Sequence, residues 1–237
     1  RTTAWSTRAP PPRPPALPRS ACQGLTFWII TLEGQRSRNL ERLQGALERA
    51  ASALAARRPW PRAAVRTFRA WDTQGLSAAT VRALCAEGIL TPAIFASSSG
   101  VLVAGADPEE ASEAEAGGRR EAAHVRAAKV LGCALSHTDI WGRLAACPDD
   151  GPWIIFEDDA VVNESRPVAA VLESALATFA AGNWDMLLLG ACADPDEDCR
   201  YVGPCVVAPV RKFFGFWGYA VSRRGAARAL EAVWGAA

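Results

Sequence analysis

The hydrophobic residues of this chain follow two different periods. Short apolar runs rich in β-branched and aromatic residues predict buried strands; they lie at residues 25–32, 64–71, 153–157, 184–190 and 212–222. Apolar residues three and four positions apart predict helices; these lie at residues 37–58, 77–88, 121–146, 166–181 and after Ser222. Strands that alternate with helices predict an α/β fold, with a mostly parallel sheet and helices on both faces.

Two segments fall outside this pattern. Residues 1–24 contain "RAPPPRPPALPR" and are too rich in proline to form a core, so we expect an extended linker or stalk without fixed structure. A ligand for an SH3-type domain is the alternative for this segment. The folded domain is expected at residues 25–237. Residues 105–120 are small, charged and contain glycine, which predicts a flexible surface loop.

The composition excludes little. The 237 residues carry a formal net charge of +1, so no broad basic field favours nucleic-acid binding. No run of about 18 apolar residues is present, so no membrane span is expected in this segment. The seven cysteines lack a CxxC pair. Either a disulfide joins two of Cys192, Cys199 and Cys205, or the thiols stay reduced and mostly buried.

The first candidate chemistry lies in "WIIFEDDAVV", residues 153–162. Three consecutive carboxylates, Glu157, Asp158 and Asp159, follow a buried strand directly. Ligands of parallel α/β sheets bind at the carboxyl ends of the strands, where these residues are expected. If the backbone stays extended, Glu157 and Asp159 point to the same side, where they can hold Mg²⁺ or Mn²⁺. The alternative is a solvated strand end.

The motif "SHTD" offers a second candidate. Ser136, His137 and Asp139 are the residue types of a hydrolase triad, but Ser136 and His137 point about 100° apart on a helix and no Gly-x-Ser-x-Gly elbow is present. The helix face of His137 is otherwise apolar, so a structural histidine and a ligand-binding histidine both stay open.

The order of four motifs resembles glycosyltransferase family 25. The motifs are "LGCALSHTDIW" (131–141), "WIIFEDDAVV" (153–162), "WDMLLLG" (184–190) and "FGFWGYAVSRRGAARAL" (214–230). Members of this family include bacterial lipopolysaccharide β-galactosyltransferases and collagen hydroxylysine galactosyltransferase domains. "IITLEGQRSRNLERL" is similar to the family's opening strand, and Arg38 matches an arginine there. The similarity spans roughly residues 26–231.

The resemblance implies a GT-A-like, Rossmann-type fold and an inverting transfer of a hexose. The expected donor is a UDP-sugar, UDP-galactose above others, held with Mn²⁺ or Mg²⁺. The expected acceptor is a hydroxyl group of a glycan, lipopolysaccharide or glycoprotein. The implied residues are Asp159 and Glu157 for the metal, Asp158 and Asp185 for catalysis, and Glu157, Ser136, His137 and Arg38 for the donor. Asp185 precedes a strand, where a role in orienting the backbone is equally open.

Two other functions stay open. Departures from the family pattern at Val130, Thr31 and Trp217, and an end at Ala237 before the family's further C-terminal residues, favour a catalytically inactive module that binds a nucleotide sugar or a glycan. A phosphohydrolase would use the same carboxylates, but the sequence lacks a second His/Asp cluster and an Asp-x-Asp-x-Thr motif. The Pro-rich start fits a Golgi stem with an upstream anchor slightly better than a cytosolic linker, and the compartment stays open.

Overall fold

The structure is a computed structural model. It describes residues 24–34, 37–56, 63–73, 113–148, 151–162, 167–178, 184–193, 200–203, 206–208 and 213–234. The Pro-rich start and the predicted helix at 77–88 lie outside these residues.

The strands that the apolar runs predicted form one five-stranded sheet, in the order β2-β1-β3-β7-β4. Its members are β1 (Leu25–Thr31), β2 (Ala63–Arg69), β3 (Trp153–Glu157), β4 (Met186–Ala193) and β7 (Phe213–Val221). β1 pairs in parallel with β2 and β3, while β7 lies antiparallel between β3 and β4. Four of these five strands therefore run in one direction, and the sheet is mixed.

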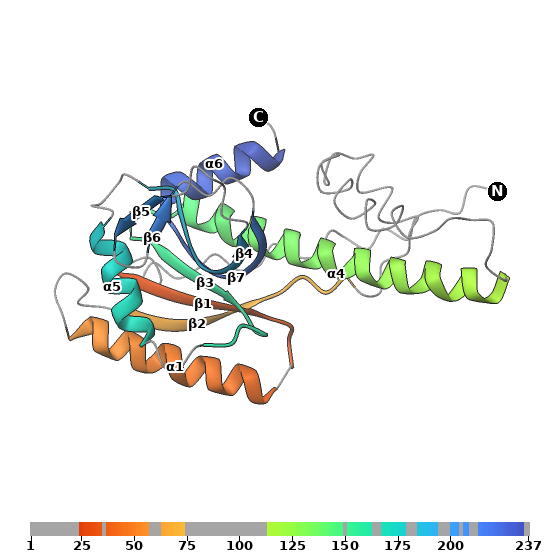
Figure 1. Ribbon diagram of the computed structural model, residues 1–237, viewed down its shortest axis with the longest axis horizontal. Coiled ribbons are helices and arrows are strands. Elements are labelled where there is room, and N and C mark those ends of the chain that lie inside the picture. Colours follow the sequence, from red (N-terminus) through yellow and green to blue (C-terminus); the bar gives the residue numbers. More distant parts are fainter. Residues whose placement is uncertain are drawn as a thin grey trace.

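Helices cover both faces of this sheet, as the alternation predicted (Figure 1). The helix α1 (Arg38–Ala55) and the helix α5 (Val168–Thr178) pack on one face. The helix α4 (Glu113–Ala145) and the helix α6 (Arg223–Trp234) pack on the other. The α/β prediction is thus confirmed at the level of architecture. Among the described helices, none is long and apolar enough to cross a membrane.

The strand β1 shows why its sequence is a continuous apolar run. Phe27 and Ile29 are buried in the core under α1, whereas Trp28 and Ile30 are buried in the core under α4. A strand covered on both faces must be apolar at every position rather than at alternate ones. A continuous apolar run is thus the pattern of a central strand that is buried between two cores.

The helix α1 begins directly after Ser37, at the start of the predicted helix 37–58. The backbone N–H of Leu40 donates to the Ser37 side chain at 3.1 Å, which satisfies a helix-terminal donor. Leu43, Leu47 and Leu54 are buried at helical spacing. The predicted amphipathic helix is therefore confirmed.

Several elements differ from the predictions. The helix α4 already begins at Glu113, so the loop predicted at 105–120 is helical from there on. Alternating Glu and Ala have high helix propensity, and two glycines cost only about 1 kcal/mol each. The strand β4 begins at Met186 rather than at residue 184 and continues to Ala193. A segment predicted as loop forms a small hairpin of β5 (Arg200–Gly203) and β6 (Val206–Ala208).

A glycine lets α6 start against the sheet. Ser222 caps the helix: its Oγ accepts from the N–H of Gly225 at 2.9 Å and donates to the carbonyl oxygen of Trp184 at 2.9 Å. A Cβ added at Gly225 would overlap the backbone of Asp185. Only glycine therefore allows this approach between α6 and the start of β4.

We expect Gly225→Ala to lower the free energy of unfolding by about 1–3 kcal/mol, because backbone must move to admit the methyl group. Gly142→Ala in α4 is the matched control, since a Cβ there meets nothing within 4 Å. That change is expected to be neutral or to stabilise by up to about 1 kcal/mol, because alanine is the better helix former. Urea denaturation measures both, and equal effects would contradict this account of Gly225.

Candidate functional site

The predicted carboxylates lie at the carboxyl ends of β1 and β3, beside α4. The segment that follows β2 lies here too. Gly132 allows this contact, because a Cβ on it would lie 2.7 Å from the carbonyl oxygen of Trp71 and 2.6 Å from Oγ1 of Thr73. The backbone N–H of Trp71 donates to Oγ of Ser136 at 2.9 Å. Segments distant in sequence therefore meet at one edge of the sheet.

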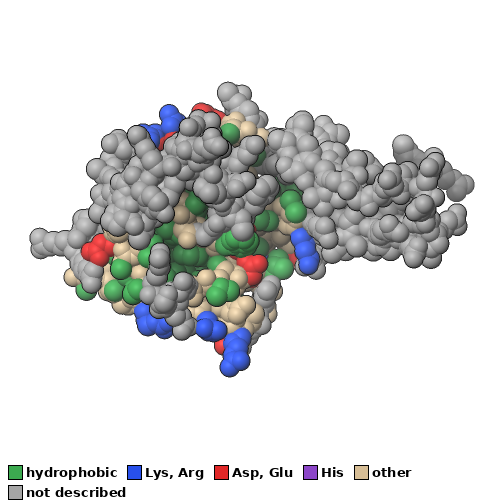
Figure 2. Space-filling view, viewed as in Figure 1, with side chains coloured by type: hydrophobic (Ala, Val, Ile, Leu, Met, Phe, Trp, Pro, Cys, Tyr) green, Lys and Arg blue, Asp and Glu red, His purple; other side chains and the backbone are tan. Residues whose placement is uncertain are grey.

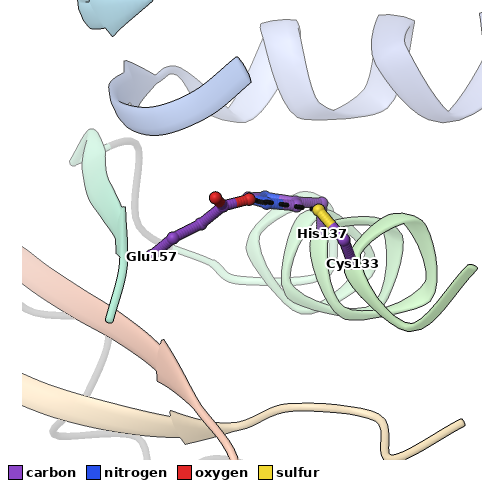
Figure 3. A group of neighbouring side chains, drawn as sticks. All are labelled: Cys133, His137 and Glu157. Carbon is purple, nitrogen blue, oxygen red and sulfur yellow. Dashed lines mark hydrogen bonds and ion pairs between the residues drawn. The ribbon is translucent and has the colours of Figure 1, made fainter. Parts of the chain in front are cut away.

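Glu157, the last residue of β3, turns toward α4 (Figure 3). Its Oε1 accepts from Sγ of Cys133 at 3.1 Å and lies 3.0 Å from Nε2 of His137. Cys133 and His137 are four positions apart, so one face of the helix presents both to the strand. The ligand atoms of the three residues all lie within 4.8 Å of one another.

The other nitrogen of His137 points into the core. Nδ1 lies 2.7 Å from the hydroxyl group of Tyr219, and Nε1 of Trp141 donates to the same hydroxyl group at 2.8 Å. Because the indole N–H can only donate, the Tyr219 oxygen accepts from it, and its proton is available to Nδ1. This arrangement favours the His137 tautomer that carries its proton on Nε2 and donates to Glu157.

This chain of hydrogen bonds sets the charges of its members. Burial alone would raise the pKa of Glu157, but hydrogen bonds from His137 and Cys133 outweigh it and leave the pKa below its usual value. Burial raises the pKa of the Cys133 thiol, and the Glu157 charge raises it further. Burial also raises the pKa of Tyr219. The structure thus favours one carboxylate beside a neutral thiol and a neutral phenol.

The two aspartates that follow have different surroundings. Oγ1 of Thr31 donates to Oδ2 of Asp158 at 2.7 Å, which ties the end of β1 to the turn after β3. Asp159 is exposed. Partial burial raises its pKa, as do the charges of Glu157 and Asp158. Within the described part of the chain, no ion pair balances the negative charge of Asp159, so its carboxylate is open to a cation.

The surroundings of the carboxylates include an exposed aromatic ring. Phe156 pairs with Gly218 across β3 and β7, so the next positions along these strands are Glu157 and Trp217. Trp217 is 38% exposed. On the face shown in Figure 2, apolar side chains gather over the sheet, with acidic side chains at their margin.

Of the predicted site residues, the structure brings Glu157, Asp158, Asp159 and His137 to this edge. Arg38 is the first residue of α1, which follows β1, and is exposed. The structure shows no contact between Arg38 and the carboxylates.

Ser136, predicted to contact a donor, is buried in the structure. Ser136 is 0% exposed; its Oγ donates to the carbonyl oxygen of Gly132 at 2.6 Å and accepts from Trp71. The residue joins α4 to the segment after β2 and has no surface for a ligand. Asp139 bonds Trp71 and Arg143 rather than His137, so the argument against a hydrolase triad agrees with the geometry.

Asp185, predicted to be catalytic, lies away from the carboxylates. The residue precedes β4, and Met186 pairs with Val221, which also pairs with Trp153 at the start of β3. Asp185 therefore lies at the opposite edge of the sheet from Glu157. Its carboxylate accepts from Arg224 at 2.8 Å and from Arg228 at 2.7 Å, and these bonds hold its pKa below the usual value. It anchors α6.

Cys133 and Tyr219 also form part of this edge, and neither is among the predicted site residues. The spacing of Cys133 and His137, four apart on a predicted helix, was a usable signal for the first. Only the pairing of β3 with β7 brings Tyr219 to His137, and that pairing is not encoded in a local pattern.

The ligand atoms available at this edge of the sheet suit a hard cation bound at Asp159. Mg²⁺ and Mn²⁺ prefer oxygen ligands and often take only one or two carboxylates, completing their shell with water and phosphate. Asp159 offers an exposed carboxylate. Glu157 offers its second oxygen, because both of its contacts use Oε1 and Oε2 points away from them (Figure 3). Asp158, bonded to Thr31, would orient the turn.

Comparison of the chain with protein-family models, curated proteins and solved structures found no significant match. The resemblance to glycosyltransferase family 25 therefore stays a prediction based on the order of the motifs.

The two aspartates with opposite pKa shifts predict opposite effects on stability. Asp159→Asn is expected to raise the free energy of unfolding slightly at pH 7, by about 0.5 kcal/mol or less, since it removes an unbalanced charge. A pKa that is raised in the folded state means that ionised Asp159 destabilises the fold. The gain from Asp159→Asn therefore disappears below about pH 4, where Asp159 is protonated in both the folded and the unfolded state.

Asp185→Asn is the matched control with the opposite sign. The pKa of Asp185 is lowered in the folded state. Its ion pairs therefore contribute to the free energy of unfolding above the pKa of Asp185 in the unfolded chain, and this contribution disappears as the pH falls. We expect a loss of about 0.2–1 kcal/mol at pH 7, the range of exposed ion pairs. Denaturant unfolding at pH 7 and pH 3.5 measures both variants, and destabilisation by Asp159→Asn at pH 7 would contradict the unbalanced charge.

Proposed function

We propose that this protein is a metal-dependent glycosyltransferase that moves a hexose from a UDP-sugar to a hydroxyl group of a glycan or glycoprotein. One observation supports this most: His137 of the Gly-Cys-x-x-Ser-His motif contacts both Glu157 of the acidic motif and Tyr219 of the closing aromatic motif. Four motifs suggested the family by their order, and these three of them meet at one edge of the sheet, as a shared donor site requires.

Each residue of this edge has a distinct part in the proposal. Asp159, with the second oxygen of Glu157, would hold Mn²⁺, which when bound neutralises the diphosphate of the donor. The His137 hydrogen bond fixes the carboxylate of Glu157, so that it needs no reorganisation when a donor binds. Thr31 fixes Asp158 in the same way. The chain thus presents rigid carboxylates on the ends of strands.

The acceptor would approach from the side of Trp217. Its ring is exposed and lies on the strand next to the one that ends in Glu157. Aromatic rings with an apolar face and a polar edge suit the stacking of sugars. Inverting transfer also needs a carboxylate that takes the proton of the acceptor hydroxyl group. Asp158, predicted as catalytic, is the candidate on this edge.

The alternative is a module of the same fold that binds a nucleotide sugar without transferring it. One observation favours it: His137 and one oxygen of Glu157 are already satisfied by internal hydrogen bonds and, like Tyr219, contribute to the core. Binding would then need only Asp159 and the surrounding surface.

The deciding experiment measures UDP release from a panel of UDP-sugars, with Mn²⁺ or with a chelator, for wild type, Asp159→Asn and Asp185→Asn. We expect Mn²⁺-dependent release, greatest for UDP-galactose, and a fall on the order of 100-fold or more in Asp159→Asn because the metal is lost. Asp185→Asn is the matched control: it removes an equal charge at the far edge and is expected to keep its activity.

Calorimetric binding of the same sugars separates the alternatives. Mn²⁺-dependent binding without UDP release would favour the binding module. The absence of both binding and release would overturn the proposal and leave the carboxylates as a strand end. A loss of activity in Asp185→Asn as large as in Asp159→Asn, with both variants folded, would contradict the placement of the site.

A further inference from the structure

A second set of metal-ligating atoms lies beside the carboxylates and differs from them in chemistry. It consists of Sγ of Cys133, Nε2 of His137 and Oε1 of Glu157, all within 4.8 Å of one another. Mn²⁺ and Mg²⁺ prefer oxygen, whereas a thiolate together with an imidazole is typical of Zn²⁺. From this donor set we infer a site for Zn²⁺ or a similar borderline metal. It uses Oε1 of Glu157, whereas the cation proposed at Asp159 would use the other oxygen of the same carboxylate.

The distances suit such an ion with a small adjustment. Sγ of Cys133 lies 3.1 Å and Nε2 of His137 lies 3.0 Å from Oε1 of Glu157. Tetrahedral bonds of the usual lengths to zinc separate two ligand atoms by about 3.3–3.6 Å. These two pairs would therefore open by only a few tenths of an ångström, while the third pair, Sγ and Nε2, lies within 4.8 Å. Two of the three ligands come from adjacent turns of one helix, which keeps their spacing fixed.

The histidine is already oriented for this role. A ligating histidine typically has its second ring nitrogen bonded to a protein group that fixes the ring. Nδ1 of His137 lies 2.7 Å from the Tyr219 hydroxyl group, which Trp141 holds in turn. The Tyr219 oxygen has two lone pairs, so it can accept from Trp141 and from a protonated Nδ1 together. The proton on His137 would move from Nε2 to Nδ1 as Nε2 binds the metal.

Charge and access are also consistent with the inference. A thiolate and a carboxylate match the charge of a divalent ion, and the proton of the thiol is released to solvent on binding. The thiol of Cys133 is partly buried against Glu157, but the residue as a whole is exposed on α4, so an ion can reach the site from outside. Three protein ligands leave a fourth position for water or for another ligand. The site does not depend on the proposed transferase activity.

The experiment titrates the purified chain with Co²⁺, a spectroscopic substitute for Zn²⁺, and follows the thiolate-to-cobalt charge-transfer absorption. The variants are Cys133→Ala and, as a matched control, Cys147→Ala, which removes a buried free cysteine from the core near the end of the same helix. We expect the band in wild type and in Cys147→Ala, displacement of Co²⁺ by Zn²⁺, and loss of the band in Cys133→Ala.

Two further variants separate this site from its neighbours. Tyr219→Phe keeps all three ligands but removes the group that orients His137, so Zn²⁺ affinity is expected to fall by about 10–100-fold. Asp159→Asn is expected to leave Zn²⁺ affinity within about threefold, even if Mn²⁺ binding is lost. Absence of the band in wild type, its survival in Cys133→Ala or its loss in Cys147→Ala would overturn the inference, whatever the result of the UDP-release assay.

Discussion

The candidate site depends on one buried chain of hydrogen bonds. It runs from Trp141 through Tyr219 and His137 to Glu157 and joins α4, β7 and β3. A buried polar group left without a partner costs about 1–3 kcal/mol, so such a chain is stable only when all of its members are in place. It therefore fixes the position of α4 along the sheet more strictly than apolar packing, which tolerates small shifts.

The same chain divides three adjacent carboxylates into three environments. Glu157 faces α4 and is held by His137; Asp158 faces β1 and is held by Thr31; Asp159 faces solvent with its charge unbalanced. Three equivalent carboxylates would repel one another with no preferred geometry. Partners from the protein fix two of them and leave the third available, which is how the structure tolerates such a sequence.

Much of the architecture could be predicted because it follows from burial. Strands covered on both faces must be continuously apolar, and α1 shows its cap and its stripe of leucines. The direction of the turn after β3 could not be predicted, since the backbone leaves the extended conformation at Asp158. The position of Asp185 was predictable, because a residue that precedes a parallel strand lies at the edge opposite the carboxyl ends. The contact of Tyr219 with His137 could not be predicted, because it depends on the order of the strands in the sheet.

The motif Gly-Cys-x-x-Ser-His has a physical explanation that applies whatever the protein binds. Gly132 allows backbone contact with the segment after β2, and Ser136 bonds that segment on the same face of the helix. Cys133 and His137, each one position further along, point to Glu157 instead. One stretch of α4 therefore contacts two strand ends at once. Because glycine and serine fix the helix and cysteine and histidine fix the carboxylate, the four residues act together to build this edge of the sheet.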